Sequence, residues 1–301
     1  MQPWISQLAE HEVGAVLTDE PMSRHTTWKI GGPADALIIP EHKGQLQKLI
    51  RLLHLQRIPW MLLGKGSNLL VSDKGIRGAV IKLGASFEFA EFRGREVEAG
   101  GGTSFVSLSV MAGKKGLTGL EFASGIPGTV GGAVYMNAGA HGSDVSRVFK
   151  SAEIVLENGE LVTCGSEEMA FQYRHSFLHR RRGAVVGAVF ELEEGNPESI
   201  RASMAAFKER RRNTQPLQMP CAGSVFRNPP GDFAARLIES AGLKGTRVGG
   251  AEISGVHANF IVNTGQATAE DVLTLMNHIR NTIADRSGVE LVPEVFVVGE
   301  R

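Results

Sequence analysis

Residues 123–142 read ASGIPGTVGGAVYMNAGAHG, a segment made almost entirely of glycine and of small or apolar residues. A glycine inside a helix or strand costs about 0.5–1 kcal/mol relative to alanine, so a regular element with this composition is unfavourable unless something lies against its bare backbone. We predict that a flat cofactor carrying phosphate groups lies there. The alternative is a set of tight turns between short strands, because Pro127-Gly128 and Gly131-Gly132 are turn signals by themselves.

A second glycine-rich segment, GKGSNLL at residues 64–70, follows a predicted strand earlier in the chain. Its backbone N–H groups would form an anion-binding nest, and Ser67 and Asn68 would add side-chain hydrogen bonds to a pyrophosphate. It is not the dinucleotide fingerprint, because Leu69 replaces the third glycine and no acidic residue follows about 20 positions later at a strand end. An ordinary strand-to-helix turn is the alternative for this loop alone. Two such loops indicate that both close on one extended cofactor.

Length and composition limit the class of protein. A chain of 301 residues predicts two or three domains. Lysine plus arginine equals aspartate plus glutamate at 32 each, so no overall field directs the chain to nucleic acid or to an anionic membrane. Two cysteines, Cys164 and Cys221, predict neither a disulfide framework nor a metal site and indicate a reducing compartment. The first residues resemble no signal peptide, and no run of about 18 apolar residues occurs, so we expect a soluble cytoplasmic protein.

The apolar spacing predicts a mixture of helices and strands. Residues 41–57 carry Leu46, Leu49, Ile50 and Leu53 at helical spacing and lead into a short buried strand at 60–63. The other predicted helices are 103–115 with Thr103 as N-cap and Gly116 as stop, an arginine-rich helix from about Ser199, a short helix ending near Gly242, and a last helix with the capping box Thr268-x-x-Asp271 and the buried stripe Val272, Met276, Ile279 and Ile283. The other predicted strands are 79–83, 96–100, 153–164 with a hairpin at Asn158-Gly159, 184–194 and 257–263.

Five segments together resemble one protein family. They are KIGGPADALIIP (29–40), LGKGSNLLVSD (63–73), FASGIPGTVGGAVYMNAGAHG (122–142), AGSVFRNP (222–229) and LVPEVFVVG (291–299). Their order is that of the UDP-N-acetylenolpyruvoylglucosamine reductases (MurB), flavoenzymes of peptidoglycan synthesis, and the resemblance runs from about Ser23 to Val298. The short stretch between Arg201 and Ser224 lacks the insertion of the longer type I class, so the match is to the shorter type II class.

The resemblance implies an α+β fold in three parts. A two-part FAD-binding domain of the p-cresol methylhydroxylase type would occupy residues 1–83 and 84–200. A smaller α/β domain for the UDP-sugar would follow at 201–301, and the last few residues are compatible with a return to the first part.

The resemblance also implies three catalytic residues. Arg174, in QYRHSFL, matches the family's catalytic arginine, whose planar guanidinium can hold a carboxylate or stabilise an enolate. Ser224 matches the serine that gives a proton to the substrate carbon; Phe226 stands where a hydrolase G-x-S-x-G motif has its last glycine, which argues against a nucleophile elbow. Glu294 interrupts an apolar run that predicts a strand, and a buried carboxylate there must meet an arginine, a serine or a ligand. Without the family, the three would be interpreted as a surface arginine, a turn serine and an outward-facing strand residue.

The two glycine-rich segments supply the residues expected to bind FAD. These are Gly64, Lys65, Gly66, Ser67, Asn68, Leu69, Ser124, Gly125, Ile126, Pro127, Gly128, Thr129, Gly131, Gly132, Ala133, Asn137 and Gly139. For the UDP group the expected residues are Arg212, from the basic run 210–212, together with Asn228, Lys244 and His257. The run Arg180–Arg182 is interpreted as a solvent-exposed face, and no metal site is predicted.

The predicted function is the NADPH-dependent reduction of UDP-N-acetylglucosamine enolpyruvate to UDP-N-acetylmuramate through non-covalent FAD. Such a reaction belongs to peptidoglycan precursor synthesis, and hence to cell wall biogenesis, cell shape and cell division. We expect a monomer that has no nucleic-acid partner and does not insert into a membrane. One alternative is a sugar or alcohol oxidase or dehydrogenase of the wider p-cresol methylhydroxylase flavin family. The other is a non-catalytic nucleotide-binding protein that kept the glycine loops.

Overall fold

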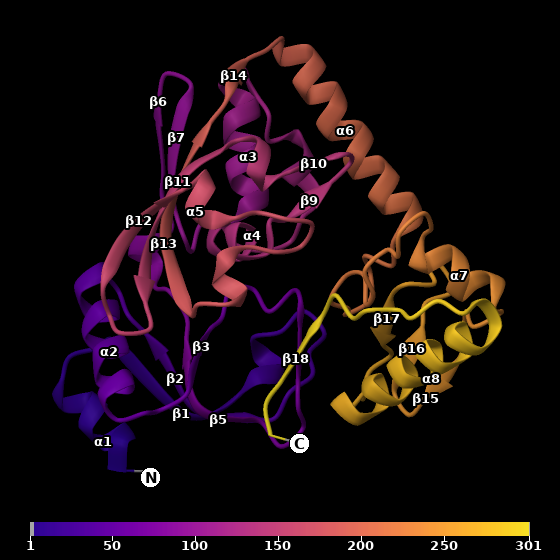
Figure 1. The fold of residues 1–301 in the computed structure, drawn as a ribbon, viewed down its shortest axis with the longest axis horizontal. Coiled ribbons are helices and arrows are strands. Elements are labelled where there is room, and N and C mark those ends of the chain that lie inside the picture. The colour runs from indigo at the N-terminus through magenta and orange to yellow at the C-terminus, as the bar shows by residue number, and fades with distance from the viewer. Residues whose placement is uncertain (1–2, 301) are drawn as a thin grey trace. The chain divides into compact units, whose positions relative to one another are not determined.

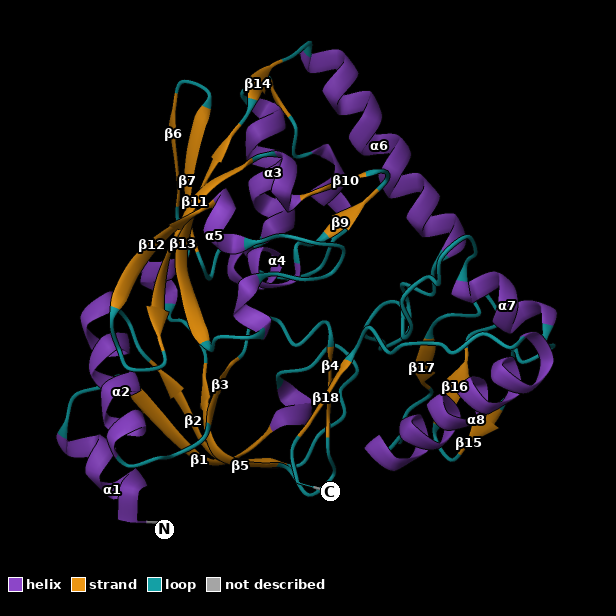
Figure 2. Cartoon of the chain, in the orientation of Figure 1, coloured by secondary structure: helices purple, strands orange, loops and turns teal. Residues whose placement is uncertain are grey.

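The computed structural model describes residues 3–300, in which helices and strands alternate along the chain (Figure 2). The chain forms two compact units. Unit 1 consists of residues 1–18, 36–64 and 78–209, and unit 2 of residues 19–35, 65–77 and 210–301. Unit 1 contains two clusters of buried apolar side chains and unit 2 contains one of its own. The mixed content confirms the α+β class.

The first part of unit 1 contains the helices α1 (Pro3–Glu10) and α2 (Lys43–Leu55) together with a sheet (Figure 1). Helix α2 (Lys43–Leu55) buries Leu46, Leu49, Ile50 and Leu53, which confirms the predicted stripe. These side chains pack into one core with residues of α1 (Pro3–Glu10). The accompanying sheet has the order β1-β2-β5-β3, with bounds Ala15–Pro21, Pro33–Ile39, Ile76–Ile81 and Trp60–Leu62, and β3 runs parallel to β5.

The second part of unit 1 is a five-stranded antiparallel sheet that packs against helix α4. Its order is β12-β11-β13-β7-β6, with bounds Leu161–Gly165, Phe149–Leu156, Gly183–Glu191, Glu96–Gly100 and Ala90–Arg93. The predicted hairpin is confirmed, because β11 and β12 pair on either side of Asn158-Gly159 and Gly159 has φ +81°. The remaining elements are α3 (Phe105–Lys114), α4 (Val130–Met136), α5 (Ser166–Met169), the long α6 (Pro197–Thr214), and the two-stranded pairs β8 (Leu117–Thr118) with β14 (Glu193–Glu194) and β9 (Gly139–Ala140) with β10 (Ser143–Asp144).

Two predictions about unit 1 are wrong in detail. The N-cap of α3 is Ser104, whose hydroxyl accepts the N–H of Ser107. The hydroxyl of Thr103 instead donates to the carbonyl of Phe89 at 2.7 Å, so this longer-range bond decides between two neighbouring residues that can both cap a helix. The segment 123–142 is also not only turns, because its middle forms α4 in spite of its glycines.

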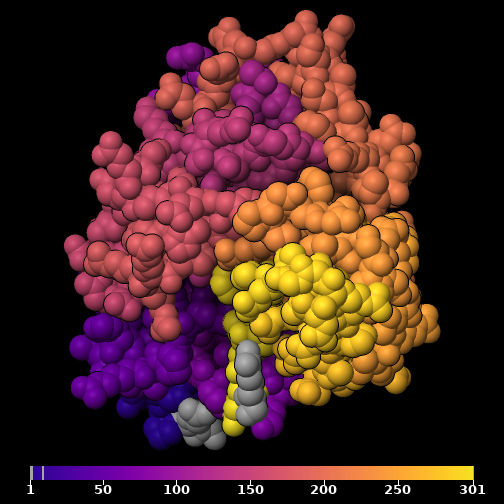
Figure 3. Space-filling view, turned by 45° about the vertical axis from the view of Figure 1, so that its right-hand side comes forward, coloured from indigo at the N-terminus to yellow at the C-terminus, as the bar shows by residue number. Residues whose placement is uncertain are grey.

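Unit 2 packs two helices and a small sheet around one core. The sheet has the order β15-β16-β17, with bounds Arg247–Val248, Ala251–Ile253 and Ile261–Asn263, and all pairings are antiparallel. The helices are α7 (Ala234–Ser240) and α8 (Ala269–Ser287), and α8 has the predicted capping box and buried stripe. A parallel pair joins β4 (Leu69–Val71) to β18 (Phe296–Val298). Figure 3 draws the C-terminal part of unit 2 in orange and yellow in a space-filling view.

Three local predictions about unit 2 need correction. The predicted strand 257–263 is a strand only in β17, because Phe260 donates its N–H to the carbonyl of His257 and closes a turn. Glu294 lies before β18 and not within a strand. The loop at 64–70 leads into β4, so the strand-to-helix alternative is wrong.

Candidate functional site

Arg174 lies at the tip of a tight turn in unit 1. Gln172 and His175 exchange both backbone hydrogen bonds at 3.0 Å, so Tyr173 and Arg174 form the two-residue tip. Arg174 has φ +54°, in the left-handed region that residues other than glycine rarely adopt, at a cost of about 1–3 kcal/mol. Its Nη2 donates to the carbonyl of Gly139 at 2.9 Å, and its guanidinium carbon lies 5.0 Å from the Tyr173 ring centre. The surroundings thus hold a strained arginine in one place, which is typical of a functional side chain.

The glycine-rich segment owes its glycines to two different causes. Gly131 is buried, and a Cβ there would lie 3.0 Å from the carbonyl oxygen of Gly101. Glycine is therefore needed at 131 because helix α4 packs directly on the protein's own backbone. Gly132 is exposed, and the nearest atom to a Cβ there would be Thr129 Oγ1 at 3.6 Å. Because the fold does not require glycine at 132, its bare backbone is available to a ligand.

Gly64, which begins the first glycine-rich segment, lies beside Thr129 of the second in unit 1. A Cβ on Gly64 would lie 2.9 Å from Thr129 Oγ1. In the second segment the hydroxyl of Ser124 is buried and has no hydrogen-bond partner among residues 3–300. A buried hydroxyl normally has a partner, so Ser124 is suited to a ligand with polar groups. The unpartnered hydroxyl and the bare backbone at Gly132 fit a cofactor that carries phosphate and hydroxyl groups.

In unit 2 the remainder of the first loop is bound to the segment that carries Glu294. Asn68 donates its side-chain N–H to the carbonyl of Glu294 at 3.1 Å, and its own carbonyl accepts the N–H of Phe296 at 3.0 Å. Gly66 has φ +60°, and a Cβ there would lie 2.4 Å from the carbonyl oxygen of His25. The amide of Asn68 therefore helps to hold the backbone of Glu294, the predicted catalytic residue.

Unit 2 places Ser224 and Glu294 on neighbouring backbone segments. The N–H of Glu294 donates to the carbonyl of Val225 at 2.7 Å, and Phe226 and Pro293 form an antiparallel bridge. Ser224 and Glu294 are both partly exposed. The segments of the two predicted catalytic residues of unit 2 are therefore joined by a backbone hydrogen bond between Glu294 and Val225, the residue after Ser224.

Asn259 is a residue that the sequence analysis missed. It is 3% exposed, its Oδ1 accepts the N–H of Phe226 at 3.0 Å, and its Nδ2 donates to the carbonyl of Phe226 at 2.8 Å. Its own carbonyl accepts the N–H of Val225 at 2.9 Å. Asn259 thus supplies Val225 and Phe226, the two residues after Ser224, with the hydrogen bonds that a neighbouring strand would otherwise make. The signal in the sequence is an asparagine placed among the apolar residues of ANFIV at 258–262.

Two of the residues predicted to bind UDP interact within unit 2. Burial lowers the pKa of His257, and the positive charge of Lys244 lowers it further. Nδ1 of His257 accepts the N–H of Asn259 at 3.3 Å, which requires that nitrogen to be unprotonated. Lys244 also forms an ion pair with Glu239 at 2.6 Å. The two residues therefore form one partly buried polar group.

The other two predicted UDP residues are exposed. Asn228 accepts the N–H of Ala234 at 3.1 Å through its Oδ1, which caps the start of α7 and leaves its amide nitrogen at the surface. Arg212 lies on the exposed side of α6.

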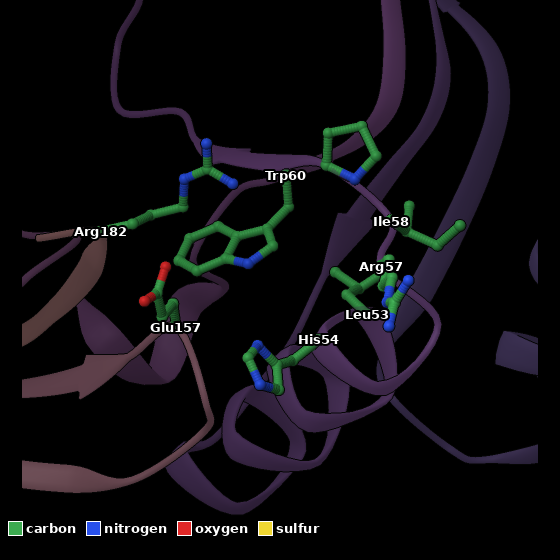
Figure 4. A pocket seen from close by; sticks show the side chains of 8 residues that line it. Leu53, His54, Arg57, Ile58, Trp60, Glu157 and Arg182 are labelled. Atoms are coloured by element: carbon green, nitrogen blue, oxygen red, sulfur yellow. The ribbon is translucent and has the colours of Figure 1, made fainter.

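A pocket of about 320 Å³ lies in unit 1 (Figure 4). The guanidinium of Arg182 lies over the ring of Trp60, with 5.7 Å from its carbon to the ring centre. Arg180, Arg181 and Arg182 are all exposed, in agreement with the predicted solvent-exposed face. The pocket contains none of the predicted catalytic, cofactor or substrate residues; its lining is Leu53, His54, Arg57, Ile58, Pro59, Trp60, Glu157 and Arg182.

Within the described part of the chain, His, Cys, Asp and Glu side chains form no cluster that could hold a metal ion. The helices of residues 3–300 include none with the length and apolar character needed to cross a bilayer.

Comparison with known proteins decides the family. Residues 34–165 match the FAD binding domain family, and residues 215–298 match the C-terminal domain of UDP-N-acetylenolpyruvoylglucosamine reductase. The chain is 50% identical over 300 residues to the UDP-N-acetylenolpyruvoylglucosamine reductase of Bacillus subtilis (strain 168), which covers 99% of both chains. The chain belongs to the UDP-N-acetylenolpyruvoylglucosamine reductase family. This confirms the resemblance found in the sequence.

Solved structures agree with membership of the reductase family. The crystal structure of the reductase (MurB) from Thermus caldophilus matches with a TM-score of 0.81 and 37% identity, over 94% of this chain and 98% of that one. A Phl p 4 variant described as a glucose oxidase matches with a TM-score of 0.52 and 15% identity, over 75% of this chain and 52% of that one. The oxidase alternative therefore has only the fold in common with this chain.

The family matches also cover most of the predicted site. The FAD binding domain match includes both glycine-rich segments, and the C-terminal domain match includes Ser224 and Glu294. The protein is thus an FAD-containing oxidoreductase of the reductase family. The roles of individual residues stay predictions.

Proposed function

We propose that the protein reduces UDP-N-acetylglucosamine enolpyruvate to UDP-N-acetylmuramate, with NADPH as electron donor and non-covalent FAD as cofactor. The full-length match at 50% identity to a reductase of this name carries the proposal. Two features of the structure support it, which are the strained Arg174 of unit 1 and the joined Ser224 and Glu294 segments of unit 2.

FAD, when bound, takes a hydride from NADPH and supplies it to the vinyl carbon of the enolpyruvyl ether. The predicted cofactor residues of the two glycine-rich segments would hold FAD. Among them, Ser124 offers a buried hydroxyl with no partner in the described chain, and Gly132 offers a backbone without a side chain in the way. These two features fit a large ligand with phosphate and hydroxyl groups.

Arg174 and Glu294 would stabilise the charge that develops on the substrate. Hydride addition to the vinyl carbon places negative charge on the adjacent carbon and its carboxylate, as in an enolate. A fixed guanidinium or protonated carboxyl group aimed at this charge contributes about 3–4 kcal/mol for each preorganised donor. Arg174 is preorganised by its bond to the carbonyl of Gly139, and Glu294 by its backbone bonds to Val225 and Asn68.

Ser224 would complete the reduction as proton donor. The carbon next to the carboxylate takes the hydroxyl proton, so that one hydride and one proton saturate the double bond. Proton transfer by a positioned group accelerates a reaction by about 10²–10⁴-fold. Asn259 fixes the backbone after Ser224 relative to the Glu294 segment, so the backbone that carries the hydroxyl is held in place.

The UDP group would be bound by Arg212, Asn228, Lys244 and His257. We further propose that residues 1–83 and 84–200 form the cofactor domain and 201–301 the substrate domain. The protein would act in the cytoplasm as a monomer, in the peptidoglycan synthesis that supports cell shape and division.

An anaerobic titration of the purified protein tests the proposal. NADPH should bleach the visible absorbance of the flavin, and the enolpyruvyl sugar should then restore it. Bleaching without recovery would refute the reductase function. Denaturation should release free FAD, because the proposed cofactor is not covalently bound.

Two variants test the residue roles. Ser224→Ala should keep its flavin and its reduction by NADPH but lose the reaction with the enolpyruvyl sugar by about 10²–10⁴-fold. Glu294→Gln should slow the same half-reaction more than the first one. Equal losses in both half-reactions would indicate a structural role for Glu294, and unchanged turnover in Ser224→Ala would remove Ser224 from the mechanism.

A further inference from the structure

We propose that Asn137 is a positioning residue that fixes Arg174 for the substrate half-reaction. This inference rests on the proposed function, in which Arg174 stabilises the charge on the substrate. It replaces the cofactor contact that the sequence predicts for Asn137.

The side-chain amide of Asn137 is bound to protein backbone at both ends. Asn137 is 3% exposed and follows the last residue of α4. Its Nδ2 donates to the carbonyl of Gln172 at 3.1 Å, and its Oδ1 accepts the N–H of Ser146 at 2.9 Å. The amide therefore connects the end of α4 to the base of the Arg174 turn.

The bond to Gln172 acts on the residue that closes the turn. The carbonyl of Gln172 also accepts the N–H of His175, and the N–H of Gln172 donates to the carbonyl of His175. Arg174 is in the left-handed conformation at φ +54°, so the turn is strained and depends on its surroundings. The amide of Asn137 donates a second hydrogen bond to the carbonyl of Gln172, which also accepts the hydrogen bond that closes the turn.

Two further contacts align the same two segments. Arg174 Nη2 donates to the carbonyl of Gly139, and the buried hydroxyl of Ser176 donates to the carbonyl of Tyr135 at 2.7 Å. The contacts of Tyr135, Asn137 and Gly139 thus reach Ser176, Gln172 and Arg174, so three hydrogen bonds connect the two segments. Among these three hydrogen bonds, Asn137 contributes a side chain, whereas Tyr135 and Gly139 contribute backbone carbonyls. Asn137 also lies between the other two residues in the sequence.

We call these three hydrogen bonds, from Tyr135, Asn137 and Gly139 to Ser176, Gln172 and Arg174, the clamp. The clamp connects Arg174 to the glycine-rich segment. Helix α4 runs from Val130 to Met136, directly between Thr129 and Asn137. Because the helix is short and rigid, the position of the arginine turn is set relative to the segment that contains the predicted cofactor residues. A misplacement of a reacting group by about 1 Å can cost a hundredfold in rate.

Asn137 also has φ +42° at the end of α4, so a mere helix-capping role must be separated from the clamp. Glycine adopts this conformation without strain and is the usual residue at such a position. Asn137→Gly therefore keeps the cap and removes the amide. Asn137→Asp keeps an oxygen for the N–H of Ser146 and removes the donor to Gln172.

The test measures the two half-reactions of the flavin-loaded protein by stopped-flow absorbance. Both variants should slow reoxidation by the enolpyruvyl sugar by about 10- to 100-fold and leave reduction by NADPH within about twofold. Hydrogen exchange of the 172–176 peptide should become faster in both variants. In an Arg174→Ala background, Asn137→Gly should slow reoxidation by the enolpyruvyl sugar by less than about a further twofold, because the two residues act through one interaction.

Ser109→Ala is a matched control in the same unit. Its hydroxyl is buried and donates to the carbonyl of Leu120 at 2.7 Å, far from the turn in sequence. The control loses one buried hydrogen bond and should leave both half-reactions and the exchange of residues 172–176 unchanged.

Several results would overturn the inference. Wild-type rates in Asn137→Gly would reduce Asn137 to a helix cap, and equal slowing of both half-reactions would indicate a general structural role. A full additional loss in the Arg174→Ala background would show that Asn137 does not act through Arg174. An Arg174→Ala protein with an unchanged substrate half-reaction would refute the proposed role of Arg174 itself, and with it the need for a clamp.

Discussion

The substitution Asn259→Ala should destabilise unit 2 strongly, although it removes only a small polar side chain. The amide of Asn259 bonds to both the N–H and the carbonyl of Phe226, and the residue is 3% exposed. The backbone groups of Phe226, which is 1% exposed, would lose partners that water cannot easily replace. Each buried unsatisfied group costs about 1–3 kcal/mol, so the two together should cost about 2–6 kcal/mol.

This loss is large against a typical domain stability of about 5–15 kcal/mol. It is measured from urea unfolding curves, followed by the fluorescence of Trp28, which lies in the core of unit 2. Asn281→Ala is the control, because Asn281 is exposed on α8 and its loss should change stability by no more than about 0.5 kcal/mol.

A second variant separates the two hydrogen bonds. Asn259→Asp keeps an acceptor for the N–H of Phe226 but places a second oxygen opposite its carbonyl, so it should be at least as unstable as Asn259→Ala. A loss below about 1 kcal/mol in Asn259→Ala would equal that of one ordinary hydrogen bond and would refute the reasoning. If Asn259→Asp matched the wild type, the bond to the Phe226 carbonyl would contribute nothing.

Three further predictions concern charge and burial. Burial lowers the pKa of His257 below its unfolded value of about 6.5. The stabilising contribution of the neutral ring is therefore present above that pH and is lost as the pH falls below it. Urea midpoints should fall over this pH range, and the fall should be smaller in His257→Gln. Asp73 accepts the first two N–H groups of α8, one on each carboxylate oxygen, so Asp73→Ala should cost about 1 kcal/mol in urea unfolding, and Asp73→Asn, which keeps an acceptor for only one of the two N–H groups, should also lose stability. Burial raises the pKa of Cys164 and of Cys221, so a disulfide reagent near neutral pH should label both thiols more slowly in the native protein than in urea; equal rates would contradict this.

Local signals in the sequence were sufficient for the elements whose causes are local. The stripe of α2, the capping box of α8 and the Asn158-Gly159 turn each depend on residues a few positions apart, and the structure confirms all three. The prediction of Thr103 as the N-cap of α3 was wrong because the Thr103 hydroxyl donates to the carbonyl of Phe89, and Ser104 caps the helix instead. Gly131 and Gly132 are alike in sequence, yet only Gly131 is required by the approach of the Gly101 carbonyl, which no local pattern encodes.

The site shows the same division between local and long-range causes. The resemblance predicts catalytic roles for Arg174, Ser224 and Glu294, since these residues lie in recognisable segments. It did not identify how they are held. The amides of Asn137 and Asn259 bond to carbonyls 35 and 33 residues away, and only the fold brings those groups together.

The use of asparagine at both positions has a common physical reason. Arg174 and Ser224 lie on short irregular segments whose backbone groups have no complete sheet to pair with. An asparagine amide carries an N–H donor group and a carbonyl acceptor, as a peptide group does, so its side chain can pair with a backbone residue as a neighbouring strand would. A buried amide must also satisfy both of its ends, which leaves one arrangement of the segment it holds. The segment that carries each predicted catalytic residue is therefore fixed within its own unit before any substrate binds, which is a condition for electrostatic stabilisation without reorganisation during the reaction.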